Sequence, residues 1–195
     1  MKPALIIFIK NPEKGKVKTR LAATVGDDEA LRIYGELLKH TRQITEEIYG
    51  LDRYVFYSSF VDETDDWKVP HFYKKMQSSG GLGDKMSRAF QEVFESKSPV
   101  LIVGSDCASL TSEIILKAYE ILKEKDFVIG PAVDGGYYLL GMKTFEPSVF
   151  EHIQWSTDQV FPQTKLNIKK LKKTVGLLPE LSDIDREKDW KRWGW

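Results

Sequence analysis

The chain has 195 residues, of which 42% are hydrophobic and 30% charged, and it carries 29 basic and 29 acidic side chains. This composition is typical of a globular protein, and the length suits a single domain over residues 1–195. A zero charge balance argues against nucleic-acid binding, which needs a broad basic surface, although it leaves room for a local cationic pocket.

Two further features of the sequence indicate where in the cell the protein is located. The longest apolar run has about six residues, so we expect neither membrane insertion nor a signal peptide. The single cysteine, Cys107, cannot form an internal disulfide, and a cysteine-based zinc site is excluded. We therefore expect a cytoplasmic protein.

Strand-like and helix-like apolar patterns alternate along the chain. The pattern predicts a buried strand at 4–9, a helix from Asp27 to about Tyr49, strands at 53–59 and 71–76, and a helix at 82–96. It then predicts a strand at 99–106, a helix at 111–125 with an N-cap at Thr111 or Ser112, and a strand–turn–strand unit at 126–142. A helix at 157–173, a short strand at 174–179 and a helix at 185–193 complete the order.

This order predicts an α/β fold with a mostly parallel sheet and one antiparallel excursion. Open sheets of this kind bind ligands at the carboxyl ends of their strands. We therefore expect the loops at 10–20, 77–84, 104–110 and 131–137 to share one rim.

The first loop, "KNPEKGKVKTRLA", carries the cations Lys10, Lys14, Lys16, Lys18 and Arg20 directly after the first predicted strand. A phosphate chain would neutralise these side chains, and backbone N–H groups beside Gly15 could help to hold it. The alternative is a solvated basic loop, which is common for lysine. The spacing is neither that of a Walker A loop nor "GxGxxG".

The segment "LIVGSDCASLT" delivers Asp106 to the end of a predicted apolar strand. A carboxylate opposite a cationic loop suits a divalent metal that bridges to phosphates, because Mg²⁺ takes one or two carboxylates together with water and substrate oxygens. The alternative is a turn or helix-capping role for Asp106.

Two glycine-rich segments are further candidates. In "GPAVDGGYYLLG", Asp134 precedes Gly135 and Gly136, which implies a positive φ or a ligand pressed against the backbone, although Asp-Gly is also a common hairpin signal. In "QSSGGLGDKM", the helix start at Gly83 and Asp84 either faces a ligand or simply caps that helix.

The closing segments leave three pairs of roles open. In "IQWSTDQVFPQT", Ser156 or Thr157 could cap a helix, while Trp155 belongs to the core or covers a ligand. In "LSDIDREKDW", Asp185 either caps the last helix or supplies a second metal ligand. The C-terminal tryptophans form either a homodimer patch or a tail packed on the domain.

Taken together, the segments "KNPEKGKVKTRLA", "GGLGDKM", "GSDCASLT", "PAVDGGYYLLG", "IQWST" and "DIDREKDW" resemble the nucleotide-diphospho-sugar transferase superfamily with the glycosyltransferase-A fold. More closely, the chain resembles a glycosyltransferase-like family related to the guanylyltransferases that activate 2-phospho-lactate. Three departures from the superfamily's patterns stand out. The "LAGGxGxR" loop of the molybdenum-cofactor guanylyltransferases is replaced by "KNPEKGKVKTRLA", no "DxD" stands at the strand end, and Ala108 stands where the family commonly has proline.

The resemblance implies a three-layer α/β/α fold and a Mg²⁺- or Mn²⁺-dependent transferase that takes a nucleotide donor and a small-molecule acceptor. Catalytic roles fall on Lys18, Arg20, Asp106 and Asp134, and metal binding on Asp106 and Asp185. The remaining implied contacts are Lys10, Gly15, Gly83, Asp84 and Ser105 for the nucleotide, and Gly135, Gly136, Trp155, Ser156 and Thr157 for the acceptor.

Three functions follow as hypotheses. The first is nucleotidyl transfer from an NTP to a small phosphorylated acceptor, in which cations and a metal stabilise the leaving pyrophosphate. The second is glycosyl transfer from an NDP-sugar. The third is a non-catalytic nucleotide-binding or regulatory module on the same fold, favoured by Ala108 and the missing "DxD".

Overall fold

In the computed structural model, which describes residues 1–195, seven strands form one sheet in the order β3-β2-β1-β4-β6-β5-β7. The strands are β1 (Lys2–Ile9), β2 (Asp52–Tyr57), β3 (Tyr73–Met76), β4 (Lys97–Val103), β5 (Phe127–Pro131), β6 (Tyr137–Met142) and β7 (Val175–Leu177). The helices are α1 (Thr19–Val25), α2 (Asp27–Glu46), α3 (Leu82–Phe94), α4 (Ser112–Glu124), the 3₁₀ helix η1 (Pro147–Phe150), α5 (Val160–Lys170) and α6 (Glu187–Trp193).

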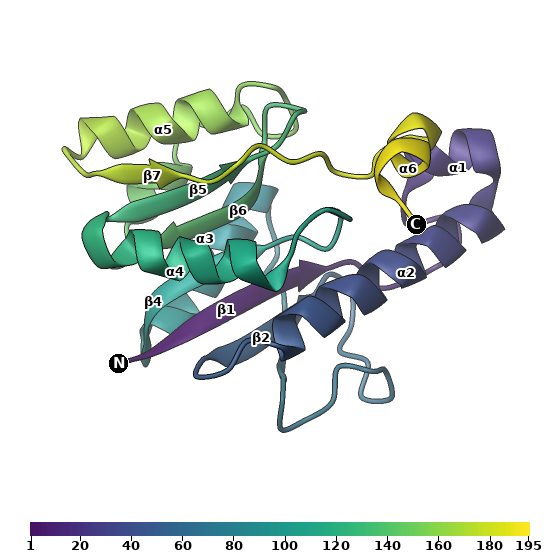
Figure 1. Cartoon of the computed structure of the whole chain (residues 1–195), viewed down its shortest axis with the longest axis horizontal. Helices are drawn as coiled ribbons and strands as arrows, with labels where there is room; N and C mark the ends of the chain where they lie inside the picture. The colour runs from purple at the N-terminus through teal and green to yellow at the C-terminus, as the bar shows by residue number, and fades with distance from the viewer.

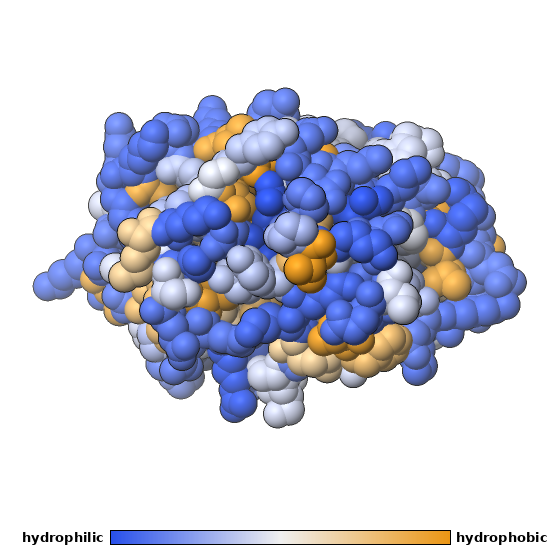
Figure 2. All heavy atoms as spheres, turned by 90° about the horizontal axis from the view of Figure 1, so that it is seen from below, coloured by the Kyte–Doolittle hydropathy of each residue, from blue (hydrophilic) through white to orange (hydrophobic).

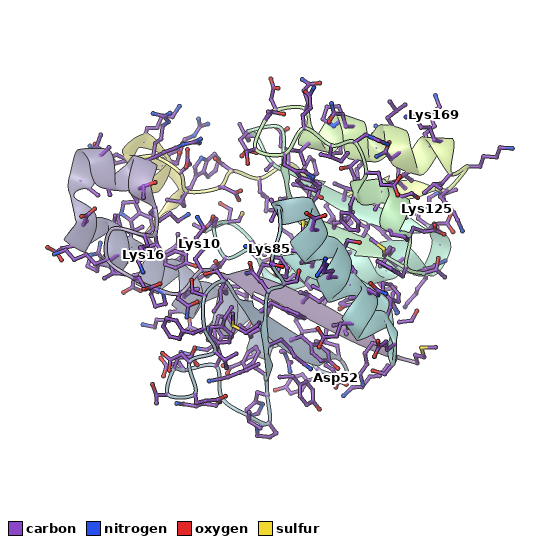
Figure 3. The ribbon with its side chains drawn as sticks, turned by 180° about the vertical axis from the view of Figure 1, so that it is seen from behind. Lys10, Lys16, Asp52, Lys85, Lys125 and Lys169 are labelled. Atoms are coloured by element: carbon purple, nitrogen blue, oxygen red, sulfur yellow. The ribbon has the colours of Figure 1, made fainter.

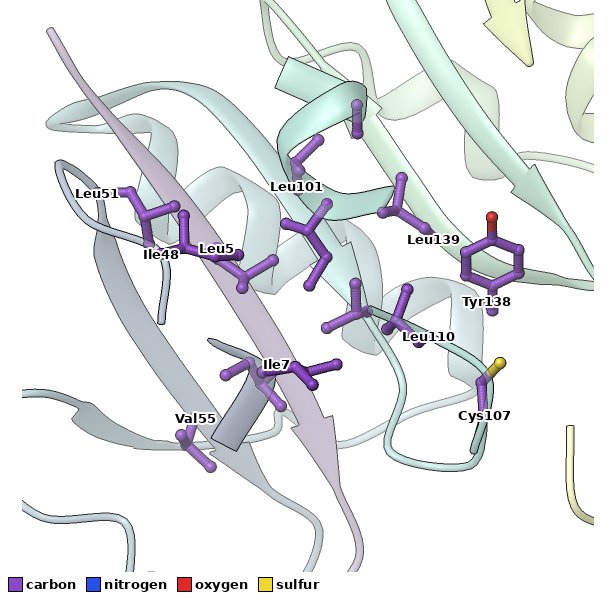
Figure 4. Close-up of a cluster of buried hydrophobic side chains, with 14 of the residues drawn as sticks. Leu5, Ile7, Ile48, Leu51, Val55, Leu101, Cys107, Leu110, Tyr138 and Leu139 are labelled. Carbon is purple, nitrogen blue, oxygen red and sulfur yellow. The ribbon is translucent and has the colours of Figure 1, made fainter. Parts of the chain in front are cut away.

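Helices cover both faces of the sheet, so the fold has the predicted three α/β/α layers (Figure 1). Alternate strand residues separate the two halves of the core, because neighbouring side chains of a strand point to opposite faces. One apolar cluster joins Leu5 and Ile7 to residues of α2 and α4, and Figure 4 shows part of it. The other joins Ala4 and Ile6 to residues of α3, η1 and α5.

Only β6 runs antiparallel to its neighbours β4 and β5, while all other strand pairs are parallel. The prediction of a mostly parallel sheet with one antiparallel excursion is confirmed. The switch point lies at β1, which pairs with β2 on one side and with β4 on the other. No helix is long and apolar enough to cross a membrane.

The structure corrects the predicted elements at two places. The basic segment predicted as a loop over 10–20 ends in α1, a seven-residue helix. Only Leu21 of this helix is buried, so its apolar residues are too few to predict a helix from the sequence. The predicted helix over 157–173 is shorter, because α5 begins after an N-cap at Gln159 rather than at Ser156 or Thr157. The Thr111 cap is confirmed, since its side chain accepts a hydrogen bond from the Ile114 N–H.

The C-terminal segment crosses from β7 over the sheet to α6, which lies beside α1 (Figure 1). Ile184 is fully buried in a third apolar cluster with residues of α1 and α2. The Trp195 ring lies 4.9 Å from the His40 ring and 5.8 Å from that of Trp190, so the tail packs on its own chain. Figure 2 shows a face that is mostly hydrophilic, with its apolar side chains in small groups.

Candidate functional site

A cleft of about 540 Å³ opens at the carboxyl ends of the parallel strands. All four predicted rim loops contribute to it, through Lys10, Gln77, Asp106 and Asp134 among others, so the shared rim is confirmed. Figure 3 shows Lys10 near this rim, whereas Asp52, which pairs with Lys2 and Lys97, lies at the opposite end of the sheet.

The five cations of the first loop have different surroundings. Only Lys10 and Arg20 line the cleft. Lys14 pairs with Asp28 at 2.6 Å and Lys16 pairs with Glu13 at 2.7 Å, so both lysines lie in exposed ion pairs on the outer surface. The interpretation of this segment as a solvated basic loop is therefore right for Lys14 and Lys16, whereas Lys10 and Arg20 line the cleft and Lys18 contacts its Asp106.

Lys18 lies beneath the cleft and joins three parts of the chain. Its Nζ is 2.7 Å from Asp106 Oδ1 and donates a hydrogen bond of 2.7 Å to the Ile184 carbonyl. The side chain is only 7% exposed, and the residue adopts the left-handed conformation with φ 48°. Because such a conformation is costly for a residue with a side chain, the surrounding contacts must hold it in place.

Tyr34 fixes the wall between the first loop and the end of β4. Its hydroxyl accepts a hydrogen bond from the Lys10 N–H at 2.8 Å, donates to the Lys10 carbonyl and lies 3.2 Å from Ser105 Oγ. Burial, followed by the nearby Asp106 charge, raises the pKa of Tyr34, so the phenol stays neutral. Ser105 lines the cleft but is itself buried, with its hydroxyl turned to Tyr34.

Carboxylates crowd the centre of the cleft. Burial, together with the negative charges of Asp106 and Asp134, raises the pKa of Asp183 to about 7, and Lys18 opposes this only in part. Asp185 also raises it. The negative charge around Asp183 therefore exceeds what Lys18 offsets, which is the environment that a divalent cation relieves.

The turn between β5 and β6 forms the far side of the cleft. Asp134 accepts a hydrogen bond from the Gly136 N–H at 2.9 Å, and both residues line the cleft. Gly135 lies behind them with φ 87°, and a Cβ there would come within 2.4 Å of the Asp158 backbone. Glycine at this position therefore lets the turn contact the segment before α5.

That segment, residues 155–158, lines the cleft together with the β5–β6 turn. The Trp155 indole lies against the first turn of α3, where a Cβ on Gly83 would come within 2.5 Å of it. Trp155 also borders a second cavity of about 440 Å³, which Gly83 and Asp84 line as well. Asp84 caps α3, since its carboxylate accepts a hydrogen bond from the Gly81 N–H at 3.0 Å.

Two other predicted site residues lie outside the cleft. Gly15, with φ 76°, forms a turn of the first loop. Asp185 pairs with Arg20 at 3.1 Å. The proposed capping role of Asp185 is wrong, because Arg186 is the N-cap of α6 and Asp189 supplies the capping carboxylate.

Sequence reasoning missed several residues of the cleft. Asp183 is one of three aspartates in "LSDIDREKDW", and only the placement of the buried neighbour Ile184 shows which carboxylate turns to Asp106. Gln77 donates to the carbonyls of Ile9 and Phe56, both at 3.0 Å, which fixes its amide at the rim. Tyr34 has helical spacing, so its core-like pattern hid its polar contacts.

No group of three or more His, Cys, Asp or Glu side chains is arranged to hold a metal ion unaided. A cation at this site would therefore need ligands from a bound substrate. Asp106, whose side chain is 48% exposed, and Asp183 offer carboxylate oxygens for such a shared coordination.

The fold has three α/β/α layers, and a cleft with both basic and acidic side chains lies at the carboxyl ends of its parallel strands. The chain belongs to the nucleotide-diphospho-sugar transferase superfamily and is an enzyme of that superfamily. Within it, the chain belongs to the family described as "Uncharacterized protein conserved in bacteria (DUF2064)", whose profile matches residues 43–157. No curated protein matches the chain.

Three solved structures are similar to it. A candidate nucleotide-diphospho-sugar transferase from Desulfovibrio desulfuricans G20 is 32% identical, with a TM-score of 0.88, over 94% of this chain and 82% of that one. The inositol-1-phosphate CTP transferase from T. maritima is 15% identical, with a TM-score of 0.60, over 97% and 91%. Rv0371c from Mycobacterium tuberculosis, in complex with manganese, is 8% identical, with a TM-score of 0.58, over 99% and 98%.

Proposed function

We propose that the protein is a metal-dependent transferase that takes a nucleotide donor, and that it transfers a nucleotidyl group from an NTP to a small phosphorylated acceptor. The observation that carries this is the contact between Lys18 and Asp106 at 2.7 Å, with Arg20 and Lys10 on the adjoining wall. A carboxylate for a metal and cations for phosphates thus share one cleft.

The donor's phosphates would lie along Lys10 and Arg20, which both line the cleft. Lys18 already gives one hydrogen bond to Ile184 and contacts Asp106, so it retains at most one N–H for a phosphate oxygen. Its main part in the reaction is then to fix the Asp106 carboxylate. This differs from the role expected from sequence, in which Lys18 held phosphates directly.

The residues fit a divalent cation such as Mg²⁺ or Mn²⁺. The observation that tests this fit is the crowding of Asp183 with Asp106 and Asp134, which leaves negative charge uncompensated in the cleft. Asp106 and Asp183 would hold the ion with the donor's phosphate oxygens, and it would neutralise charge on those oxygens. The manganese complex of the Mycobacterium tuberculosis protein supports a metal on this fold. The paired Asp185 would stay with Arg20.

In the reaction, an oxygen of the acceptor phosphate attacks the α-phosphorus of the NTP in line with the departing group. A new P–O bond forms, the bond from the α-phosphorus to the bridging oxygen breaks, and pyrophosphate leaves with the electron pair. Arg20 and Lys10 stabilise the charge that collects on pyrophosphate. No base is needed, because the acceptor phosphate is already ionised.

Glycosyl transfer from an NDP-sugar is the second candidate, and the name of the Desulfovibrio desulfuricans relative favours it. In that case Asp134, on the far side of the cleft, would orient an acceptor hydroxyl. The third candidate, a non-catalytic nucleotide-binding module, would keep donor binding and lose turnover.

Pyrophosphate release from each of the four NTPs, with sugar and polyol phosphates as acceptors and with or without Mg²⁺, tests the proposal. We expect release that depends on Mg²⁺ and is lost in Asp106→Asn, which removes the charge and keeps the shape. Asp28→Asn is the matched control, since Asp28 is 85% exposed on the outer surface. NDP-sugar turnover without pyrophosphate release would replace the nucleotidyl version with the glycosyl one, and full activity of Asp106→Asn would refute both.

A further inference from the structure

The C-terminal segment, residues 179–195, joins the two sides of the sheet across the rim of the cleft (Figure 1). At its start, the Leu181 N–H donates a hydrogen bond to the Pro131 carbonyl at the end of β5, and the Leu181 carbonyl accepts one from the Val133 N–H. The segment then crosses to α1 and α2. Asp183, which lines the cleft, lies between these two attachments. Part of the site is therefore supplied by a segment that is added to the domain from outside.

A single buried side chain anchors this segment. Among residues 179–195 only Ile184 is buried, and it lies fully enclosed in the third apolar cluster, with Leu21 of α1 and Ile33 of α2. Helix α6 has no buried residue, and Trp190 is only partly buried against the same cluster. A segment held by so few buried contacts opens at a lower cost in free energy than the rest of the domain.

The backbone of Ile184 is bonded to both members of the central ion pair. Its N–H donates a hydrogen bond of 2.8 Å to the Asp106 carbonyl, and its carbonyl accepts one of 2.7 Å from Lys18 Nζ. Lys18 Nζ lies 2.7 Å from Asp106 Oδ1, so three distant parts of the chain close one ring of contacts. Undocking of Ile184 removes a partner that orients Lys18, and it carries the neighbouring Asp183 away from the cleft.

The other attachments of the segment near the cleft are weak by comparison. The side chains of the Arg20–Asp185 pair are 66% and 48% exposed, and pairs exposed to this degree contribute little to stability. The position of the segment at the cleft therefore depends mainly on Ile184, which touches no substrate-facing surface of its own.

We infer that Ile184 is a positioning residue: its docking sets Lys18 and Asp106 for the donor, so that docking of the C-terminal segment and binding of the nucleotide with its divalent cation are coupled. The inference rests on the proposed function and adds a conformational requirement to it. The coupling is reciprocal, because a ligand that binds only the docked form also stabilises that form. At a hundred times its Kd, such a ligand lowers the undocked population about a hundredfold.

Hydrogen exchange of the wild-type protein tests this coupling. The Ile184 N–H is bonded to Asp106, so it exchanges with solvent when the segment undocks. Calorimetry with Mg²⁺ first identifies which of the four NTPs binds best. Mass spectrometry then follows exchange in the peptide over residues 181–190, with Mg²⁺ alone and with Mg²⁺ and that NTP at about a hundred times its Kd. We expect the NTP to slow exchange at Ile184 about tenfold or more.

Ile184→Ala removes the anchor and leaves every charged group in place. We expect it to speed exchange over residues 181–190 about tenfold and to weaken NTP affinity about tenfold, whereas Ile184→Val should restore most of both. Ile168→Ala is the matched control, because Ile168 is fully buried in the apolar cluster of α3, η1 and α5. It should lower the Tm to a similar degree and keep the wild-type NTP affinity and exchange over residues 181–190.

Thermal melting shows whether each variant folds. If Ile184→Ala does not fold, Trp190→Ala takes its place, with changes in the same directions and of smaller size. If no NTP binds the wild type, the proposed function fails and the inference falls with it. If an NTP binds but leaves exchange at Ile184 unchanged, or if the folded anchor variant binds it as tightly as wild type, only the inference is overturned. An equal loss of affinity in Ile168→Ala would overturn it too, because the effect would then come from general destabilisation.

Discussion

Replacing Asp183 by asparagine should stabilise the metal-free protein and at the same time abolish its activity. Asp183 shares the cleft with Asp106 and Asp134, and Asp185 adds a further negative charge, whereas Lys18 is the one cation that opposes them. Asparagine keeps the shape of the side chain and removes the repulsion. A group retained for function is often costly for stability, and this carboxylate fits that pattern.

The magnitude follows from the raised pKa of Asp183. Its rise from 3.8 to about 7 corresponds to about 4 kcal/mol at ~1.4 kcal/mol per unit. This is an upper bound, because the carboxylate borders an open cleft where water screens its neighbours. We expect a gain of about 1–2 kcal/mol at neutral pH, or a rise in Tm of roughly 4 °C for a chain of this size.

The sign of the pH dependence is fixed by the same shift. The folded protein holds the Asp183 proton up to about pH 7, whereas the unfolded chain releases it near 3.8, so the cost grows as the pH rises between these values. The stability difference between Asp183→Asn and the wild type should therefore be small near pH 4 and largest above pH 7.

Thermal melts in a chelator and in Mg²⁺ would measure this. Wild type should gain stability from Mg²⁺, and Asp183→Asn should gain much less. Asp158→Asn lines the same cleft but lies outside the group of carboxylates that raise the Asp183 pKa, so it is the matched control and should melt like wild type. A lower Tm for Asp183→Asn in chelator, or an undiminished response to Mg²⁺, would refute the reasoning.

Three other substitutions separate stability from binding. Lys18→Ala should lower the free energy of unfolding, measured in urea, by about 2 kcal/mol, because it leaves Asp106 and the Ile184 carbonyl without their shared donor. An unchanged free energy of unfolding would mean that the contact is not formed in solution. Arg20→Ala should weaken NTP binding about tenfold in calorimetry. It should change the unfolding free energy by less than about 0.5 kcal/mol, since the pair of Arg20 with Asp185 is exposed. A loss of stability as large as the loss of NTP affinity would argue for a structural role. Gly135→Ala should lower the free energy of unfolding by about 2 kcal/mol and shift the Trp155 fluorescence, because the new Cβ would meet the Asp158 backbone at 2.4 Å. A fluorescence spectrum like that of wild type would show that the turn does not fix residues 155–158.

Residues 4–9 and 99–106 show why the fold could be predicted. Their apolar runs predict buried parallel strands, and the turn residues after them predict where the rim lies. Local patterns therefore locate the cleft through the ends of the strands. The short helix α1 escaped prediction because seven residues with one buried side chain carry too little periodicity.

The partners within the cleft could not be predicted in the same way. Five basic residues follow β1, but which of them face the cleft depends on Asp28 and Glu13, which pair with Lys14 and Lys16. Asp183 and Asp185 lie two positions apart in the sequence, and only the packing of Ile184 decides which of their side chains turns toward Asp106. Such choices depend on contacts between distant segments, for which a single sequence gives no spacing rule.

The antiparallel strand β6 explains how one rim can hold two kinds of surface. A parallel strand brings its carboxyl end to the rim, whereas β6 brings its beginning, so the turn from β5 adds Asp134 and Tyr137 beside the ends of β1 and β4. The parallel strands β1 and β4 supply Lys10 and Asp106, and the reversed strand supplies an aromatic and acidic wall without a basic residue. A sheet that was parallel throughout would send the chain after β5 directly into a helix, and the wall opposite the cations would lose both residues. The reversal of one strand therefore places an acidic and aromatic wall beside Trp155, across the cleft from the basic residues Lys10 and Arg20.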